Sequence, residues 1–157
     1  MTARERLAEL GLALPEVVPP VAAYTPAVRD GDLVWTSGQL PMRDGAMAYT
    51  GKVGEGSGQG LVTPAQAKEL AAQCALNALA AVKSVVGDLD AVQRVVKVDG
   101  FVASDPSFTG QPGVINGASE LLGQVFGDAG VHARSAVGVA TLPLDSAVEV
   151  EIVVRVA

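Results

Sequence analysis

The chain has 157 residues, of which 49% are hydrophobic and 18% charged, and its formal net charge is −6. This composition is typical of one globular domain and excludes an intrinsically disordered chain. The negative charge argues against a dedicated nucleic-acid binder, which needs a cationic surface to displace counterions from phosphates. A single cysteine, Cys74, excludes an intrachain disulfide and a cysteine-based zinc site.

The first residues are polar and charged, and no apolar core of a signal peptide follows them. We find no apolar run that approaches the ~18 residues needed to cross a bilayer. These two observations predict a soluble, cytoplasmic protein.

The N-terminal third of the chain predicts a helix and then a hairpin. Residues 2–12 show a thin apolar stripe of helical spacing, and the prolines within 15–20 keep the next segment extended. A first strand is predicted over Val21–Val28 and a return strand over Leu33–Ser37. The Asp-Gly pair within Arg29–Asp32 is a strong signal for the turn between them.

Residues 42–62 are rich in glycine and predict a long loop, with room for a short edge hairpin. The run Gly54–Gly60 resembles a phosphate-binding loop only in its glycines. It lacks the Lys-Ser/Thr pair of a P-loop, and no convincing strand precedes it. A flexible loop is therefore favoured over a nucleotide site.

The clearest helix start in the chain is Thr63-Pro64-Ala65-Gln66. Thr63 can cap the helix, Pro64 suits its first turn, and Gln66 completes a capping box. The apolar spacing predicts a helix that ends near Val86. Cys74 lies on its apolar face, which favours inert core packing over a nucleophile.

The remaining elements are a strand over residues 92–103, a helix with an apolar stripe from Val114 to Phe126, and two final strands. The final strands cover residues 132–142 and 147–156, and the turn signal Pro143–Ser146 between them predicts a second hairpin. The order ββαβαββ predicts an α+β fold, a mixed sheet with two helices packed on one face. We expect the other face to be covered by association of subunits.

Each final strand carries a charge that an apolar core strand would lack: Arg134 in the first and Glu149 in the second. A hairpin would bring the guanidinium and the carboxylate to one neighbourhood. From the residues alone, both a buried salt bridge and a chemical site explain the pair.

The same residues resemble a known family. The pattern consists of Tyr24, Val34–Pro41 and the C-terminal motifs Ala133–Val137, Leu142-Pro143 and Val148–Glu151. It is similar to the YjgF/Rid family of reactive intermediate (imine/enamine) deaminases, whose members are also called endoribonuclease L-PSP. The resemblance covers nearly all of residues 21–157, so we expect a single domain over 1–157 in which 1–20 is an N-terminal extension.

The resemblance implies a chorismate-mutase-like fold, a homotrimer and ligand sites in clefts between subunits. It implies hydrolysis of reactive 2-imino or enamine acids to 2-oxo acids and ammonia, with no metal and no organic cofactor. The expected partners are thus a small carboxylate-bearing imino or oxo acid and further copies of the chain, with no membrane. The N-terminal helix and the 42–62 loop look like additions to the family's minimal chain.

The family's functional residues match four side chains here. Arg134 matches the arginine that grips the substrate carboxylate, and a planar guanidinium suits that role. Glu149 matches the acid associated with the attacking water. Tyr24 matches a tyrosine that lines the site, and Asn116 matches a helix asparagine that faces the cleft.

Two further positions are expected to contribute backbone hydrogen bonds to substrate: Gly38 and Ala136. Ala136 replaces a cysteine that is common in relatives, so no thiol is expected there. His132 stands where many relatives have proline, and we expect a surface residue that modulates the cleft. With separate roles for Arg134 and Glu149, a gap between them that holds an imino acid and a water is expected instead of direct contact.

Two other functions remain open. A non-catalytic module of the same fold would bind a small carboxylate at Arg134 without turnover. RNA cleavage or inhibition of translation, also reported for the family, is less favoured because the chain is acidic.

Overall fold

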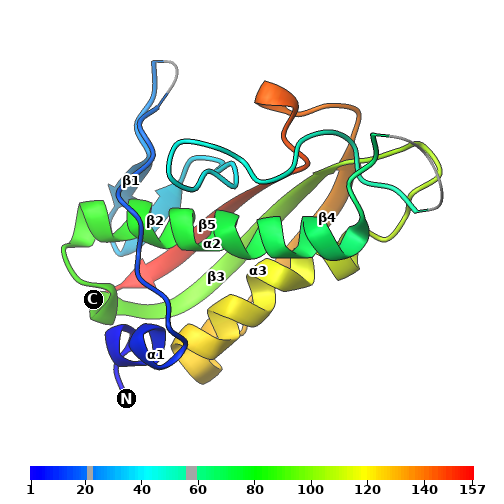
Figure 1. The fold of residues 1–157 in the computed structure, drawn as a ribbon. Helices are drawn as coiled ribbons and strands as arrows, with labels where there is room; N and C mark the ends of the chain where they lie inside the picture. The colour runs from blue at the N-terminus through cyan, green and yellow to red at the C-terminus, as the bar shows by residue number, and fades with distance from the viewer. Residues whose placement is uncertain (21–22, 56–59) are drawn as a thin grey trace.

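The computed structural model describes residues 1–20, 23–55 and 60–157. Five strands form one mixed sheet in the order β1-β2-β5-β3-β4, and the helices lie on one of its faces (Figure 1). The strands are β1 Ala27–Asp30, β2 Leu33–Thr36, β3 Val92–Ala103, β4 Ala133–Val139 and β5 Val148–Val156. Only β3 and β4 run parallel; the other neighbours are antiparallel. The α+β fold expected from the sequence is confirmed.

Two long helices cover the sheet, and a short one precedes them. The helices are α1 Ala3–Glu9, α2 Pro64–Val86 and α3 Gln111–Phe126, with 3-10 turns η1 Leu89–Ala91, η2 Gly127–Gly130 and η3 Pro143–Asp145. The predicted capping box of α2 is confirmed: Thr63 accepts from the Gln66 N–H at 3.1 Å, and Gln66 accepts from the Thr63 N–H at 3.0 Å. By length and composition α2 would pass for a membrane span, but 61% of its most apolar window is buried in the core.

The predicted C-terminal hairpin is wrong, because β3 lies between β4 and β5 and pairs with both. The connection between the two strands pairs instead with the segment around residue 50. The Gly51 N–H donates to the Asp145 carbonyl at 2.8 Å, and Thr50 forms a bridge with Ser146. Since these long-range partners satisfy the backbone of the connection, the chain crosses the end of β3 and does not turn back beside β4.

The first predicted strand begins too early. Pairing starts at Ala27, and Tyr24 lies in a bend before β1; the predicted start, residues 21–22, falls outside the described residues. Pro26 has no N–H to donate to a neighbouring strand. The predicted turn is confirmed, with Gly31 at φ 63° in the loop between β1 and β2.

The described residues of the 42–62 segment are more ordered than the flexible loop expected from the glycines. Val53 and Val62 pair in an isolated bridge, and both side chains are buried in the core. Val53 also pairs with Ser104, just after β3. The glycine run weighed as a phosphate loop lies partly on residues 56–59, which are outside the described residues.

The two faces of the sheet differ in what covers them. One face packs against α2 and α3 and buries β-strand valines such as Val98 and Val154. The opposite face, called the open face here, carries large apolar side chains that remain exposed: Val28 at 51%, Trp35 at 52% and Val137 at 46%. The two faces therefore differ in how completely their apolar side chains are buried.

Candidate functional site

Arg134 lies on β4 with its side chain on the helix-covered face, where α3 holds its guanidinium. Nη1 donates to Asn116 Oδ1 at 2.8 Å and to Ser119 Oγ at 3.2 Å, and Nη2 donates to the Pro112 carbonyl at 3.3 Å. Asn116 and Ser119 are three residues apart and so share one side of the helix. The structure therefore brings the predicted Arg134 and Asn116 together and adds Ser119 to them.

All three acceptors around Arg134 are neutral oxygens. The ion pairs among the described residues are Lys68–Glu120 and Lys97–Asp99, so no carboxylate in this part of the chain neutralises Arg134. The Nε–H of Arg134 and one of its two Nη2–H groups donate to none of these three acceptors. A guanidinium held in this way keeps its charge and part of its donor fork for an anion.

Sequence reasoning missed the role of Ser119 and the contacts of His132. His132 lies just before β4, and its Nε2 is 2.8 Å from Ser119 Oγ. Its Nδ1 is 2.6 Å from the Gly130 carbonyl oxygen. The signal that was available is the spacing of Asn116 and Ser119 on one side of the predicted helix.

Glu149 lies on β5 and points to the open face. Its side chain is half-buried, and burial raises its pKa above the ordinary glutamate value because water solvates the charged form less well there. Gly38 lies against it: a Cβ built on Gly38 would be 2.7 Å from both Cδ and Oε2 of Glu149. Gly38 thus provides the space that this carboxylate occupies.

Tyr24 belongs to the same end of the molecule. It is 47% exposed and lines a hollow of about 50 Å³ together with Gly38, Gln39 and Leu144. Tyr24, Gly38 and Glu149 therefore form one group, which we call the Glu149 group. Arg134, Asn116 and Ser119 form the other, the Arg134 group.

Asn77, a second residue that sequence reasoning missed, secures the loop beside the Glu149 group. It is buried in α2, and its Nδ2 donates to the carbonyls of Leu40 and Met42, both at 2.9 Å. These bonds satisfy two backbone acceptors just after Gly38 and Gln39. The loop is therefore anchored to the core helix.

The two groups lie on opposite faces of one sheet. Arg134 pairs with Val98, which is buried under the helices, whereas Glu149 pairs with Phe101, three residues further along β3. Since strand residues alternate between faces, an odd separation reverses the direction of the side chain. The hypothesis that a hairpin brings Arg134 and Glu149 to one neighbourhood of the same chain is therefore wrong, and a salt bridge between them is absent from the described residues.

Ala136 follows Arg134 on the helix-covered face, opposite Gly100, and packs partly against the core. Close packing explains the small residues here, because a Cβ on Gly100 would be 2.5 Å from carbons of Ile115. Ala136 thus continues the surface of β4 that begins at Arg134.

Other reactive groups offer no competing site. Cys74 is fully buried, and burial, with a smaller contribution from the Glu149 charge, raises the pKa of its thiol far above the ordinary value. A thiol in such surroundings is a poor nucleophile. Among the described residues, no three side chains of His, Cys, Asp or Glu gather in a way that would hold a metal ion.

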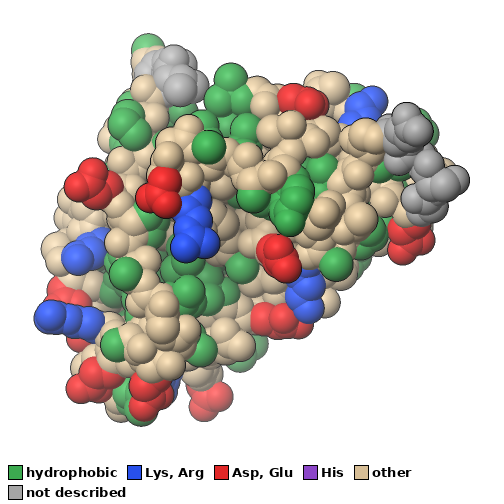
Figure 2. All heavy atoms as spheres, in the orientation of Figure 1, with side chains coloured by type: hydrophobic (Ala, Val, Ile, Leu, Met, Phe, Trp, Pro, Cys, Tyr) green, Lys and Arg blue, Asp and Glu red, His purple; other side chains and the backbone are tan. Residues whose placement is uncertain are grey.

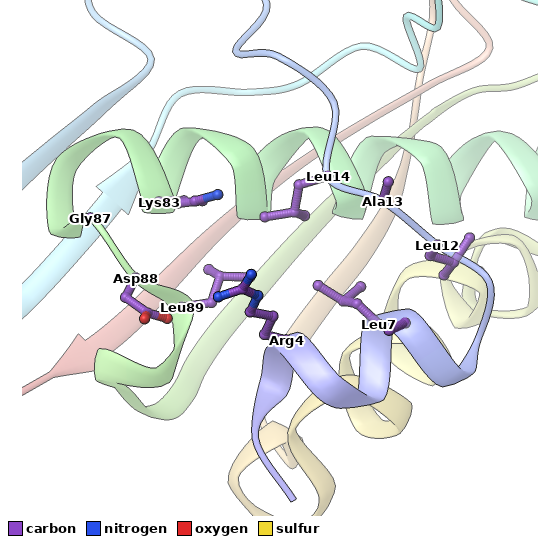
Figure 3. Close-up of a pocket in the computed structure, with 10 residues that line it drawn as sticks. Arg4, Leu7, Leu12, Ala13, Leu14, Lys83, Gly87, Asp88 and Leu89 are labelled. Carbon is purple, nitrogen blue, oxygen red and sulfur yellow. The ribbon is translucent and has the colours of Figure 1, made fainter.

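A larger hollow than the one beside Tyr24 lies elsewhere, between α1, the segment after it and the end of α2 (Figure 3). It has a volume of about 450 Å³, and the apolar Leu7 and Leu89 and the cationic Arg4 and Lys83 are among the residues that line it. Asp88 and the C-terminal carbonyls of α2 offset these two cations. The hollow contains none of the predicted site residues.

Comparison with known proteins agrees with this fold and these motifs. The family model described as "YjgF/chorismate_mutase-like, putative endoribonuclease" matches residues 4–156. The chain belongs to this family. The match begins at residue 4, so it includes all of α1 except its first residue.

The chain is also similar to individual members. It is 43% identical over 150 residues to protein TCP17 of Trypanosoma cruzi, covering 95% of this chain and 91% of that one. The crystal structure of protein Atu1372 of Agrobacterium tumefaciens, described as having unknown function, matches with 45% identity and a TM-score of 0.88 over 99% of this chain and 94% of that one. A "putative endoribonuclease" of Shewanella oneidensis MR-1 matches with 29% identity and a TM-score of 0.91 over 99% of this chain and 100% of that one.

Proposed function

We propose that this YjgF-family protein is a deaminase of the Rid type, which hydrolyses reactive 2-imino or enamine acids to 2-oxo acids and ammonia. One observation carries the proposal. Arg134 is fixed by neutral oxygens, is paired with no carboxylate among the described residues, and keeps part of its donor fork. Such a group binds a small carboxylate and fixes the plane of the C=N bond next to it.

Glu149 has the properties needed to activate the water that attacks the imine carbon. An iminium carbon is already electrophilic, so the protein has only to place a water and accept its proton. A half-buried carboxylate with a raised pKa can accept that proton at a pH closer to neutrality than an exposed one. An enamine reaches the same point after it takes a proton on its β-carbon and becomes the iminium.

The reaction balances with Glu149 as the only proton carrier. Water oxygen bonds to the iminium carbon while Glu149 takes a water proton, and the C=N π electrons move to nitrogen. The resulting carbinolamine loses ammonia when Glu149 returns this proton to nitrogen and takes the hydroxyl proton as the C–N bond breaks; that last proton leaves with ammonia as ammonium. The C=O bond of the 2-oxo acid forms as the C–N bond breaks, with no redox change and no cofactor needed.

A complete site requires two copies of the chain in this proposal, because Arg134 and Glu149 point to opposite faces of one sheet. The Arg134 group of one copy would meet the Glu149 group of another. The exposed Val28, Trp35 and Val137 on the open face support association through that surface. We propose a homotrimer, the closed assembly that the family resemblance implies.

RNA cleavage is the alternative suggested by the name of the Shewanella oneidensis relative. The net charge of −6 counts against it. On the helix-covered side, Lys and Arg side chains are scattered among acidic ones and form no continuous basic surface (Figure 2). We therefore favour a small anionic substrate.

The proposal is tested by generating imino acids in place with an amino-acid oxidase and following their decay. The protein should accelerate the decay, and Arg134→Ala should lower kcat/KM by about 10² to 10⁴, the loss of two charge-assisted hydrogen bonds. Arg4→Ala is the matched control, because Arg4 lies in α1 beside the other hollow. Decay no faster than in buffer would refute the deaminase, and binding of a 2-oxo acid without turnover would favour the non-catalytic module.

A further inference from the structure

A chain of hydrogen bonds leads from Arg134 away from the donors that remain free for substrate. Arg134 Nη1 lies 3.2 Å from Ser119 Oγ, and Ser119 Oγ lies 2.8 Å from His132 Nε2. The other ring nitrogen, Nδ1, lies 2.6 Å from the carbonyl oxygen of Gly130. The chain thus ends on backbone at η2, outside the proposed substrate site.

When the His132 ring is neutral, the partners at both ends fix the direction of every bond. A carbonyl only accepts, so His132 Nδ1 carries a proton and donates it to Gly130. In the neutral ring Nε2 is then an acceptor, which takes the hydroxyl proton of Ser119. The Ser119 oxygen is left to accept from Arg134 Nη1, and each donor meets one acceptor.

This arrangement places both hydrogens of Nη1 on α3, one on Asn116 and one on Ser119. A free arginine side chain has many accessible rotamers, and part of this freedom is lost when it binds a ligand. A guanidinium that is already held loses less, so it binds a carboxylate more tightly. Ser119 holds the guanidinium in a fixed position only if its own hydroxyl proton has a fixed acceptor, and that acceptor is His132 Nε2.

We infer that Ser119 and His132 are positioning residues that hold the plane of the Arg134 guanidinium for a carboxylate ligand. The inference deepens the proposed function and rests on it for the identity of the ligand. The positioning itself is a property of the free protein. His132 acts through Ser119 and not on the ligand.

The experiment measures binding of 2-oxobutanoate by calorimetry to variants of the full chain. Ser119→Ala removes an acceptor of Nη1, and His132→Phe removes the group that fixes this acceptor, so each should weaken binding about five- to tenfold. Ser119→Thr keeps the hydroxyl, and His132→Gln keeps an acceptor near the position of Nε2, so both should recover most of the affinity. Ser84→Ala, which removes a hydroxyl from α2 far from the site, is the control.

The double variant Ser119→Ala/His132→Phe separates positioning from general damage. If His132 acts through Ser119, the double variant binds 2-oxobutanoate no more weakly than Ser119→Ala alone. Losses that multiply, or a His132→Gln variant as weak as His132→Phe, would overturn the inference. In the imino-acid assay the single variants should raise KM with kcat nearly unchanged, and a fall in kcat alone would contradict it.

A second measurement does not depend on any ligand. Nitrogen-15 NMR of the free protein should show slow rotation of the Arg134 guanidinium, with separate Nη1 and Nη2 signals that merge in Ser119→Ala. Signals that are merged already in the wild type would overturn the inference. Separate signals in a protein without affinity for 2-oxobutanoate would support positioning while refuting carboxylate capture, so the two failures are distinguishable.

Discussion

The Arg134 group and the Glu149 group handle a partly buried charge in opposite ways. Arg134 is surrounded by neutral oxygen acceptors from α3, so its charge is stabilised but not cancelled. Glu149 is partly shielded from water and lies against a glycine, so its charged form is destabilised. Hydrogen bonding suits a charge that must bind, and desolvation suits a charge that must exchange a proton.

The substitution Glu149→Gln should distinguish the roles of the two groups most clearly. The amide cannot take a proton from water, so kcat should fall by about 10² to 10⁴. Binding of 2-oxobutanoate should change little, because Arg134 is untouched on the other face. Steady-state kinetics and calorimetry check the two parts, and an equal loss of affinity would contradict separate roles.

The substitution Gly38→Ala should disturb the Glu149 group and leave the Arg134 group unchanged. The added Cβ would be 2.7 Å from Cδ and Oε2 of Glu149, which must move away from its place. We expect kcat to fall about 10- to 100-fold, since misplacing a catalytic group by an ångström has effects of this size. Circular dichroism should show an intact fold.

The matched control for this substitution is Gly113→Ala. Gly113 lies in α3 near the Arg134 group, and a Cβ there meets nothing within 4 Å. This variant should retain kcat and gain up to about 1 kcal/mol of stability from helix propensity. If Gly38→Ala retains kcat as Gly113→Ala does, catalysis does not depend on the position of Glu149.

Asn77→Ala tests whether the Glu149 group depends on its anchor in α2. The change leaves the carbonyls of Leu40 and Met42 without their donor, which should lower the free energy of unfolding by about 2–3 kcal/mol. Chemical denaturation measures this loss. The Nη signals of Arg134 should stay unchanged, and their collapse would show that the two groups are not independent.

The smallest expected effect is that of pH on stability. The folded-state pKa of Glu149 lies above its unfolded value, so this group favours the folded state most at pH below the unfolded value of 4.5. That contribution is lost as pH rises through the folded-state pKa. Glu149→Gln should therefore be slightly more stable than wild type near neutral pH, and the difference should vanish below about pH 4.

The pH dependence of activity should have the opposite sign to the pH dependence of stability. Glu149 must be ionised to take a proton, so kcat/KM should fall as pH drops through its raised pKa, and the inflection should lie above the ordinary value of 4.5. Thermal melts and rate profiles over the same buffers check both statements. A rate inflection below 4.5 would contradict a desolvated base.

The strand pattern alone indicates Arg134 and Glu149, because both are charges in apolar strands, whereas Tyr24, Gly38 and Asn116 are indicated only by the family resemblance. The start of α2 could also be predicted from the sequence, because Thr63 and Gln66 cap the helix through local hydrogen bonds. Local patterns of this kind need no knowledge of the rest of the fold.

What the sequence could not indicate depends on partners far along the chain. The connection before β5 looks like a hairpin turn, but its backbone pairs with residues near Gly51, almost a hundred positions earlier. With β3 placed between β4 and β5, the faces of Arg134 and Glu149 follow from register, and register is a property of the assembled sheet. His132 was assigned to the surface because nothing local connects it to Ser119.

The central claim is that one active site takes Arg134 from one copy and Glu149 from another. Arg134→Ala and Glu149→Gln chains with different tags are expressed together, and oligomers that carry both tags are purified and assayed. In a cyclic trimer each mixed oligomer contains a site with both native side chains, so activity should return to about one third of wild type. Mixed oligomers as inactive as the two parent variants would contradict the claim.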